Sequence, residues 1–205
     1  MKLLIFGASG RTGHFLAAKA AAAGHEAFAF TRDRNRLEAS WPQERVYVGD
    51  VLDPAAVEGA VRGKDAVLLA VGSGGLGPTT IRREAARSVV RAMTRQQVPR
   101  LVALSTAMTG EVDLPVALVL RPLVFRHVVA DARAMESVVR NAGVEYTIVR
   151  APRLRQEDGS GSYHTARGEG SRPQGRSVAR GAVADAMIRS LIRTEDINQV
   201  IAVSG

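Results

Sequence analysis

The fold of this chain is decided by residues 2–13, which read Lys-Leu-Leu-Ile-Phe-Gly-Ala-Ser-Gly-Arg-Thr-Gly. Residues 3–6 form a continuous apolar run, which is too short for a buried helix but suits a central parallel strand covered on both faces. Gly7 then turns the chain, and an alanine-rich helix is expected from about Arg11. It should stop at Gly24, because glycine readily adopts the left-handed conformation that ends many helices. The pattern predicts a strand, a glycine turn and a helix in succession.

The turn has the glycine spacing Gly7-x-x-Gly10-x-x-Gly13. Unpaired backbone N–H groups at the start of the following helix attract a pyrophosphate, helped by the helix dipole, and glycine lets the ligand approach the backbone closely. The alternative is that these glycines serve only the packing of the turn. Because they lie between a strand and a helix, a dinucleotide-binding site is favoured.

The remaining chain alternates between apolar strand patterns and amphipathic helix patterns. Further strands are expected at residues 26–30, 45–48, 66–71, 101–104, 146–149 and 200–203, and further helices from about residues 54, 79, 128 and 180. Thr79 is expected to cap the helix that follows it. This alternation is typical of an α/β fold with one doubly wound parallel sheet.

A single domain is expected for the 205 residues, since nothing marks a linker between two cores. Residues 111–127 should form a partly helical flap that leads to the helix from residue 128. Residues 155–176 are rich in Gly, Ser and Arg and should form loops or a small hairpin over the site. We therefore expect residues 111–127 and 153–178 on the substrate side of the domain.

The composition excludes several classes of site. The chain contains no cysteine, which rules out disulfides, zinc–thiolate sites and thiol catalysis and fits a reducing compartment. We predict no metal site. The N-terminus has no signal-peptide pattern and no apolar run reaches membrane-spanning length, so a cytoplasmic location without a membrane partner is expected.

The net charge of +8 suggests nucleic-acid binding as one possible function. The basic residues are nearly all arginine and are scattered along the chain, and aromatic residues make up only 4%. That is too few for a platform on which single-stranded bases would stack. Nucleic-acid binding therefore ranks last among the functions considered.

The residues after the second predicted strand indicate which dinucleotide is bound. That strand ends about 20 residues past the glycine turn, where this architecture contacts the adenine ribose. An acidic residue there would bind the 2′-hydroxyl, whereas Arg32 offers a guanidinium fork for a 2′-phosphate. An ordinary charged loop is the alternative. We favour NADP(H) over NAD(H).

Other side chains follow predicted strands at the edge where ligands bind in such sheets. Asp50 is equally well explained as an adenine contact or as a turn residue. The glycine-rich residues 72–78 suit a loop beneath the nicotinamide ribose, although flexibility alone would also explain them. Ser105 and Thr106 follow the strand expected at residues 101–104. Ser105 is the best hydroxyl for the reacting centre, with a local turn cap as its alternative.

With these residues placed, the chain resembles atypical short-chain dehydrogenases of the group that includes biliverdin reductase B, the NADPH-dependent flavin reductases. The resemblance covers nearly the whole chain. Its most specific motifs are residues 5–13, Arg32-Asp33 with Arg36-Leu37, and residues 48–52, 64–67, 78–80 and 141–146. It implies a Rossmann fold with a small loop-rich C-terminal substrate region, and an NADPH-dependent reductase.

The resemblance also implies roles for particular residues. It places Gly10, Arg11 and Thr12 at the pyrophosphate, and Arg32 and Arg36 at the 2′-phosphate. It places Asp50 and Val51 at the adenine, Gly72 near the nicotinamide, and Ser105 at the reacting centre. The predicted cofactor-binding residues are Gly7, Ser9, Gly10, Arg11, Thr12, Gly13, Arg32, Arg36, Asp50, Val51, Val71, Gly72 and Pro152, and the candidate substrate contacts are Thr106, His127 and Arg153.

Three departures from the family pattern lie on the substrate side. Residues 151–153 read Ala-Pro-Arg, where the family member compared has a histidine after two prolines. The loop after Gly72 is shorter and lacks an arginine, and residues 111–127 differ throughout. The resemblance therefore supports the prediction of the cofactor more strongly than the prediction of the substrate.

The chain lacks the Tyr-x-x-x-Lys pair with which ordinary short-chain dehydrogenases transfer a proton. Tyr146 and Tyr163 are each followed four residues later by an arginine, which cannot relay a proton at ordinary pH. Hydride transfer to a flavin, quinone or tetrapyrrole acceptor needs less from the protein, because solvent can supply the proton. Two readings remain: a reductase with a small-molecule electron acceptor, acting as a monomer or dimer, and a non-catalytic NADP(H)-sensing or binding protein.

Overall fold

The computed structural model describes residues 1–72, 74–75, 77–109, 120–159, 161 and 163–205. The helices are α1 (Arg11–Ala22), α2 (Pro54–Val61), α3 (Ile81–Gln96), α4 (Leu120–Arg140) and α5 (Arg180–Ser190). The strands are β1 (Lys2–Phe6), β2 (Glu26–Thr31), β3 (Val46–Val48), β4 (Ala66–Leu69), β5 (Arg100–Thr106), β6 (Glu145–Ala151), β7 (Arg153–Arg155), β8 (His164–Arg167), β9 (Ser177–Ala179) and β10 (Gln199–Ser204). None of the helices in these ranges is both long and apolar enough to cross a membrane.

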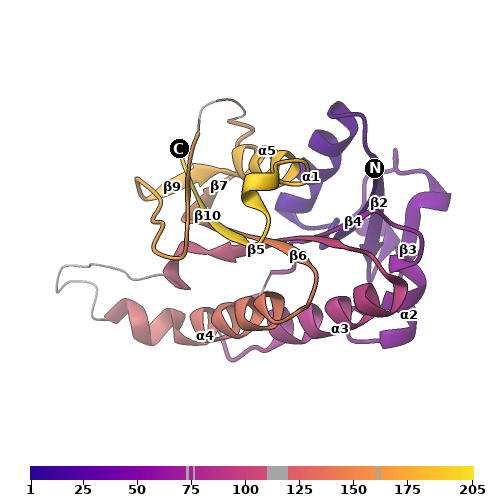
Figure 1. Ribbon diagram of the computed structural model, residues 1–205, viewed down its shortest axis with the longest axis horizontal. Coiled ribbons are helices and arrows are strands. Elements are labelled where there is room, and N and C mark those ends of the chain that lie inside the picture. The colour runs from indigo at the N-terminus through magenta and orange to yellow at the C-terminus, as the bar shows by residue number, and fades with distance from the viewer. Residues whose placement is uncertain (73, 76, 110–119, 160, 162) are drawn as a thin grey trace.

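Eight strands form one sheet in the order β3-β2-β1-β4-β5-β6-β10-β8. Every neighbouring pair is parallel except β10 and β8, which run antiparallel. Helices α1 and α5 cover one face, and α2, α3 and α4 cover the other (Figure 1). The predicted α/β fold with a doubly wound, mostly parallel sheet is confirmed.

The core divides into two apolar clusters, one on each face of the sheet. Strand β1 contributes to both, since Leu3 and Ile5 pack with α1 and α5, while Leu4 and Phe6 pack with α2, α3 and α4. All four side chains are fully buried. Successive side chains of a strand point to opposite faces, so a central strand needs an unbroken apolar run. The prediction from residues 3–6 is confirmed.

Two strands are longer than the sequence predicted. Strand β5 runs through Thr106 and β6 runs through Ala151, because the two pair in parallel along their whole lengths, with Ser105 opposite Arg150. Ser105 and Thr106 therefore lie inside a strand, not after it. Arg150 also lies in a strand, whereas the sequence suggested that it begins the exit from the sheet.

Helix α4 begins at Leu120, whereas the sequence predicted a start near residue 128. The prolines and charges of this region suggested an interrupted flap. Pro122 lies in the first turn of the helix, where a missing N–H group leaves no hydrogen bond unmade. The part of the predicted flap at residues 111–119 lies outside the described residues.

The N-terminus of α3 is capped from another helix. Asp131 of α4 accepts hydrogen bonds from the backbone N–H of Arg82 (3.1 Å) and of Arg83 (3.0 Å). Thr79, the predicted cap, accepts only a longer bond from the N–H of Ile81 (3.3 Å). A cap supplied by a residue so distant in the chain leaves no local sequence signal.

Short strands within residues 155–176 and at its two ends pair with distant segments, where the sequence predicted loops or a small hairpin. Strand β8 pairs antiparallel with β10 at the edge of the main sheet, and β7 pairs in parallel with β9 in a second, two-stranded sheet. These strands are short and their partners lie far along the chain, so the polar, glycine-rich composition concealed them.

Candidate functional site

A cleft of about 1070 Å³ opens where the carboxyl ends of β1, β2, β4, β5 and β6 meet. Strands β2 and β4 flank β1 on opposite sides, and ligands of open α/β sheets bind where the strand order reverses in this way. The predicted site residues that line the cleft are Gly7, Ser9, Gly10, Arg11, Thr12, Arg32, Arg36, Asp50, Val51, Val71, Gly72, Ser105, Thr106 and Pro152. The fold thus gathers most of the predicted residues in one place.

The three glycines of the turn do different things. Gly7 adopts a positive φ of 85°, which favours glycine, and a β-carbon there would lie 2.6 Å from the carbonyl oxygen of Ala70. A β-carbon at Gly13 would overlap the carbonyl oxygen of Gly7. These two glycines are needed for the turn itself, and Gly13 is buried and does not line the cleft.

Gly10 is the glycine that the fold does not require. It is the N-cap of α1 with φ −84° and ψ 165°, values open to any residue, and it provides no side chain to bond the first N–H groups of the helix. A β-carbon there would meet only the carbonyl oxygen of Gly7, at 3.1 Å. The space kept free in front of the helix N-terminus fits a pyrophosphate.

Two arginines converge beside this turn. Burial lowers the pKa of Arg180, and the nearby positive charge of Arg11 lowers it further. Arg180 donates to the carbonyl oxygen of Leu154 (3.2 Å), but its Nε has no hydrogen-bond partner in the described part of the chain. Like charges held together at a cleft favour an anion between them.

Arg180 was missed in the sequence, where it marked only the start of the last helix. A signal was present, because a cation at a helix N-terminus opposes the helix dipole and is placed there for a reason other than helix stability.

The far end of the cleft carries two more arginines. Arg32 and Arg36 are exposed, line the cleft and make no side-chain hydrogen bond or ion pair with any described residue. Asp33 bonds the backbone N–H of Asn35 (2.9 Å), so its carboxylate serves the local turn. Two free guanidiniums beside the end of β2 fit a phosphate group.

Asp50 acts as a turn residue and also lies where it could contact a ligand. It lines the cleft, and its Oδ1 accepts a hydrogen bond from the backbone N–H of Leu52 at 2.9 Å. Such a bond is typical of a turn residue.

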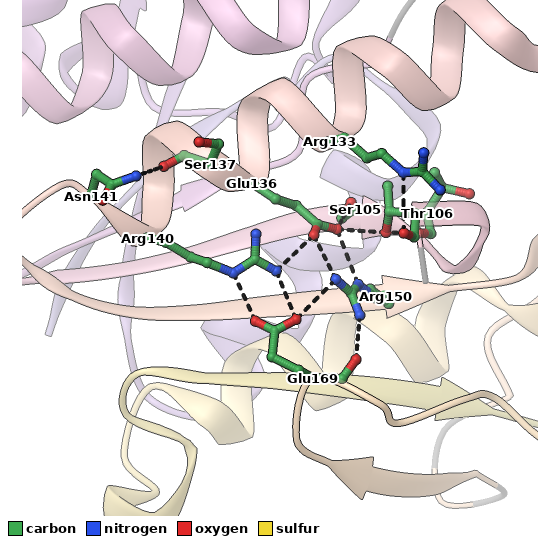
Figure 2. A network of polar contacts seen from close by, with 10 residues as sticks. Ser105, Thr106, Arg133, Glu136, Ser137, Arg140, Asn141, Arg150 and Glu169 are labelled. Carbon is green, nitrogen blue, oxygen red and sulfur yellow. Dashed lines mark hydrogen bonds and ion pairs between the residues drawn. The ribbon is translucent and has the colours of Figure 1, made fainter. Parts of the chain in front are cut away.

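Ser105 takes part in a buried polar network (Figure 2). Its hydroxyl donates to Glu136 Oε1 of α4 at 2.6 Å, and the hydroxyl of Thr109 donates to the same oxygen at 2.7 Å. Arg150 of β6 donates from Nη2 to Glu136 Oε2 at 2.7 Å and from Nε to Oε1 at 3.2 Å. Ser105, Glu136 and Arg150 are each at most 5% exposed.

The network reaches the surface through Arg140 and Glu169. Arg140 donates to Glu136 (2.9 Å) and to Glu169 (2.8 Å), and Arg150 also bonds the backbone carbonyl of Glu169 at 2.8 Å. The Glu169 side chain is 62% exposed, in contrast to the 2% of Glu136. Two carboxylates and two guanidiniums therefore connect Ser105 to the segment that follows β8 (Figure 2).

The protonation of Glu136 determines what Ser105 can do. Burial acts to raise the pKa of Glu136, but hydrogen bonds from Arg150, Ser105 and Thr109 and the charge of Arg150 outweigh it, and the pKa is lowered. Glu136 is therefore ionised and can only accept hydrogen bonds. The hydroxyl hydrogen of Ser105 is committed to it, so Ser105 offers the cleft an acceptor oxygen.

Sequence reasoning missed both Glu136 and Arg150. Each is a charged residue among buried apolar positions: Glu136 shares a buried face of α4 with Ala132, Met135 and Val139, and Arg150 follows the buried Val149 on β6. A charge at a position where the pattern requires an apolar residue indicates a buried pair.

The candidate substrate contacts separate into two groups. Thr106 lines the cleft, whereas His127 and Arg153 do not. His127 accepts a bond from Arg126 Nε (3.1 Å) on α4, and Arg153 is exposed on β7. Among the described residues, no group of three or more His, Asp or Glu side chains lies close enough to hold a metal ion.

The chain is similar to known proteins that bind NAD(P)H, in agreement with a nucleotide-sized cleft beside a glycine turn. A family model described as NAD(P)H-binding matches residues 7–194. A Rossmann-fold NAD(P)-binding family protein from Shigella flexneri is 26% identical with a TM-score of 0.74, covering 98% of this chain and 92% of that one.

Two further solved structures share the fold at lower identity. A wide-type short-chain dehydrogenase/reductase from Veillonella parvula in complex with NADP is 24% identical with a TM-score of 0.81, covering 100% of this chain and 94% of that one. An anaerobillin reductase from Escherichia coli O157:H7 is 20% identical with a TM-score of 0.81, covering 100% and 97%. These likenesses extend over the whole fold of the chain.

Proposed function

The chain belongs to the NAD(P)H-binding family, as its sequence motifs predicted, and on this basis we propose that it is an NADPH-dependent reductase with a flavin, quinone or tetrapyrrole-like acceptor. One observation carries the proposal: a single cleft joins the glycine turn, the hydroxyl of Ser105 and Arg32, whose side chain has no partner among the described residues. The similarity to a structure that holds NADP and to an anaerobillin reductase supports it.

The roles of the residues follow their places along the cleft. NADPH, when bound, supplies a hydride from C4 of its nicotinamide. We assign Gly10, Arg11, Thr12 and the newly found Arg180 to the pyrophosphate, Arg32 and Arg36 to the 2′-phosphate, Asp50 and Val51 to the adenine, and Val71, Gly72 and Pro152 to the nicotinamide side. The arginines give this cleft a positive charge that matches an anionic dinucleotide.

Ser105 orients a reacting group and does not serve as an acid. Its hydrogen is held by the ionised Glu136, so its oxygen accepts a hydrogen bond from an N–H group of the nicotinamide amide or of the acceptor. Solvent supplies any proton that the acceptor needs. An orienting serine together with protons from solvent suits acceptors that can be reduced without a tyrosine as the acid.

We also propose the wider setting of this activity. Residues 1–205 act as one domain, with residues 111–127 and 153–178 on the substrate side. The protein works in the cytoplasm as a monomer or dimer on a small-molecule electron acceptor. The composition and the resemblance of the sequence support these points.

A panel of acceptors tests the function. FMN, quinones and tetrapyrroles are mixed with the protein and NADPH, and the loss of NADPH absorbance is followed against a heat-killed control. We expect reduction of at least one acceptor. If NADPH binds tightly while every acceptor remains unreduced, the protein is an NADP(H) sensor, and the reductase proposal is wrong.

Replacing Arg32 tests the choice of dinucleotide. Charge-assisted hydrogen bonds contribute about 1.5–3 kcal/mol, so Arg32→Ala should weaken NADPH binding by about ten- to a hundredfold and leave NADH nearly unchanged. Calorimetric titration with both cofactors measures this. Arg91→Ala is the control, because Arg91 is exposed on α3 away from the cleft. Equal affinities of the parent protein for NADPH and NADH would contradict the assignment.

Replacing Ser105 tests its orienting role. Ser105→Ala should lower kcat/KM by about tenfold, which corresponds to about 1.4 kcal/mol of transition-state stabilisation. Ser137→Ala, an exposed serine next to Glu136 and outside the cleft, should leave the rate unchanged. A loss of several thousandfold in Ser105→Ala would instead mean that the hydroxyl is an obligatory proton donor.

A further inference from the structure

Arg82 lies in the first turn of α3 and lines the cleft, and some of its guanidinium N–H groups have no hydrogen-bond partner among the described residues. Its Nε and Nη1 atoms are buried and have no hydrogen-bond partner in the described ranges. A guanidinium is always charged and carries five N–H donors, and buried donors are almost always satisfied. Unpartnered donors at the wall of a cleft indicate that a ligand supplies the missing acceptor.

The nearest carboxylate does not supply that acceptor. Asp131 is 4% exposed and uses one oxygen for the N–H of Arg82 and the other for the N–H of Arg83. It makes no side-chain hydrogen bond or ion pair with Arg82 among the contacts of the described residues. Burial lowers the pKa of Arg82, and the charge of Asp131 opposes this lowering. Asp131 thus attracts the guanidinium charge from nearby, while its own oxygens serve the helix cap.

Arg82 and Ser105 both line the cleft, and both are hydrogen-bonded to α4. Helix α4 contributes both Asp131, which bonds the backbone of Arg82, and Glu136, which bonds Ser105. These two residues are about 7.5 Å apart along the helix axis, at 1.5 Å per residue. Arg32, by contrast, follows β2, which is separated from β5 by β1 and β4, or about 14 Å of sheet. Arg82 is thus placed beside the reacting end of the site.

We propose that Arg82 determines the specificity of the acceptor site by binding a carboxylate or phosphate group of an anionic acceptor. The proposal rests on the reductase function above, because the ligand in question is the molecule that is reduced. A guanidinium binds either group through two parallel hydrogen bonds. The acceptor is therefore an acidic molecule with its negative group held near the start of α3.

FMN and riboflavin test this directly, because they differ by one phosphate group. In the variant Arg82→Gln we expect the KM for FMN to rise about tenfold and the KM for riboflavin and the Kd for NADPH to stay unchanged. Arg82→Lys should recover part of the FMN affinity, since it keeps the charge but loses the fork. Arg83→Gln is the matched control, because Arg83 pairs with Glu84 at 2.8 Å and does not line the cleft.

Equilibrium binding provides a readout that needs no turnover. Quenching of flavin fluorescence, titrated in the presence of NADP⁺, should show the parent protein binding FMN more tightly than riboflavin and Arg82→Gln losing this preference. If the parent has no preference, if both flavins weaken equally in the variant, or if NADPH binding weakens instead, the proposal is wrong. If no acceptor of the panel is reduced, quinones and tetrapyrroles included, while the FMN preference still depends on Arg82, the reductase function is wrong and the anion site stands.

Discussion

Gly10→Val should raise the Kd for NADPH at least about a hundredfold, or about 2.7 kcal/mol, without unfolding the protein. The backbone of Gly10 suits valine, and its β-carbon would meet only one protein atom within 4 Å. The branched side chain would fill the space in front of the α1 N-terminus that a pyrophosphate needs. Calorimetry measures the affinity, and thermal melts should show a native-like transition that NADPH no longer raises.

Two other glycines serve as controls for this variant. Gly59 is exposed on α2, where an added β-carbon meets nothing, so Gly59→Val should bind NADPH as the parent does. Gly13→Val should destabilise the fold itself, because the β-carbon would overlap the backbone of the turn. If Gly10→Val is still stabilised by NADPH, the turn is only structural.

Glu136→Ala should lower the free energy of unfolding by about 3–5 kcal/mol, because it removes the buried carboxylate that pairs with the buried Arg150. Urea denaturation measures the loss. Glu169→Ala is a matched control, since Glu169 pairs with the same two arginines but is 62% exposed, and it should cost no more than about 1 kcal/mol. Equal losses in the two variants would contradict the buried position of the network.

The pH dependence of this stabilisation has a definite sign. The pKa of Glu136 is lowered in the folded protein from its ordinary value of 4.5, so its contribution is present above that value. It is lost as the pH falls through the folded pKa. The stability difference between the parent and Glu136→Gln should therefore be constant from neutral pH to about 4.5 and shrink below it. A difference that grows with acid would show that the carboxyl is protonated at neutral pH.

The sequence predicted those parts of the fold that local patterns determine. The apolar run at residues 3–6 specifies a strand, and the glycines that follow it specify a turn, from their neighbours alone. The position of the cleft beside the glycine turn follows from them, because the carboxyl ends of parallel strands meet at one edge.

What escaped prediction depends on pairs that are distant in the chain. Ser105 bonds Glu136 thirty-one residues away, and Asp131 caps α3 from forty-eight and forty-nine residues away. Strand β8 exists because it pairs with β10. The helical pattern shows that Glu136 lies on the apolar face of α4, but only the tertiary structure shows which partner compensates its charge.

The buried network around Glu136 has a formal charge of zero, since its two carboxylates balance the guanidiniums of Arg140 and Arg150. Exposed arginines of the cleft, among them Arg11 and Arg32, carry charges that no carboxylate of the described residues balances. Counterions screen exposed charges over about 8 Å at physiological ionic strength, while buried pairs are screened far less. Added salt therefore weakens the attraction of an anionic dinucleotide to the cleft and leaves the orientation of Ser105 intact.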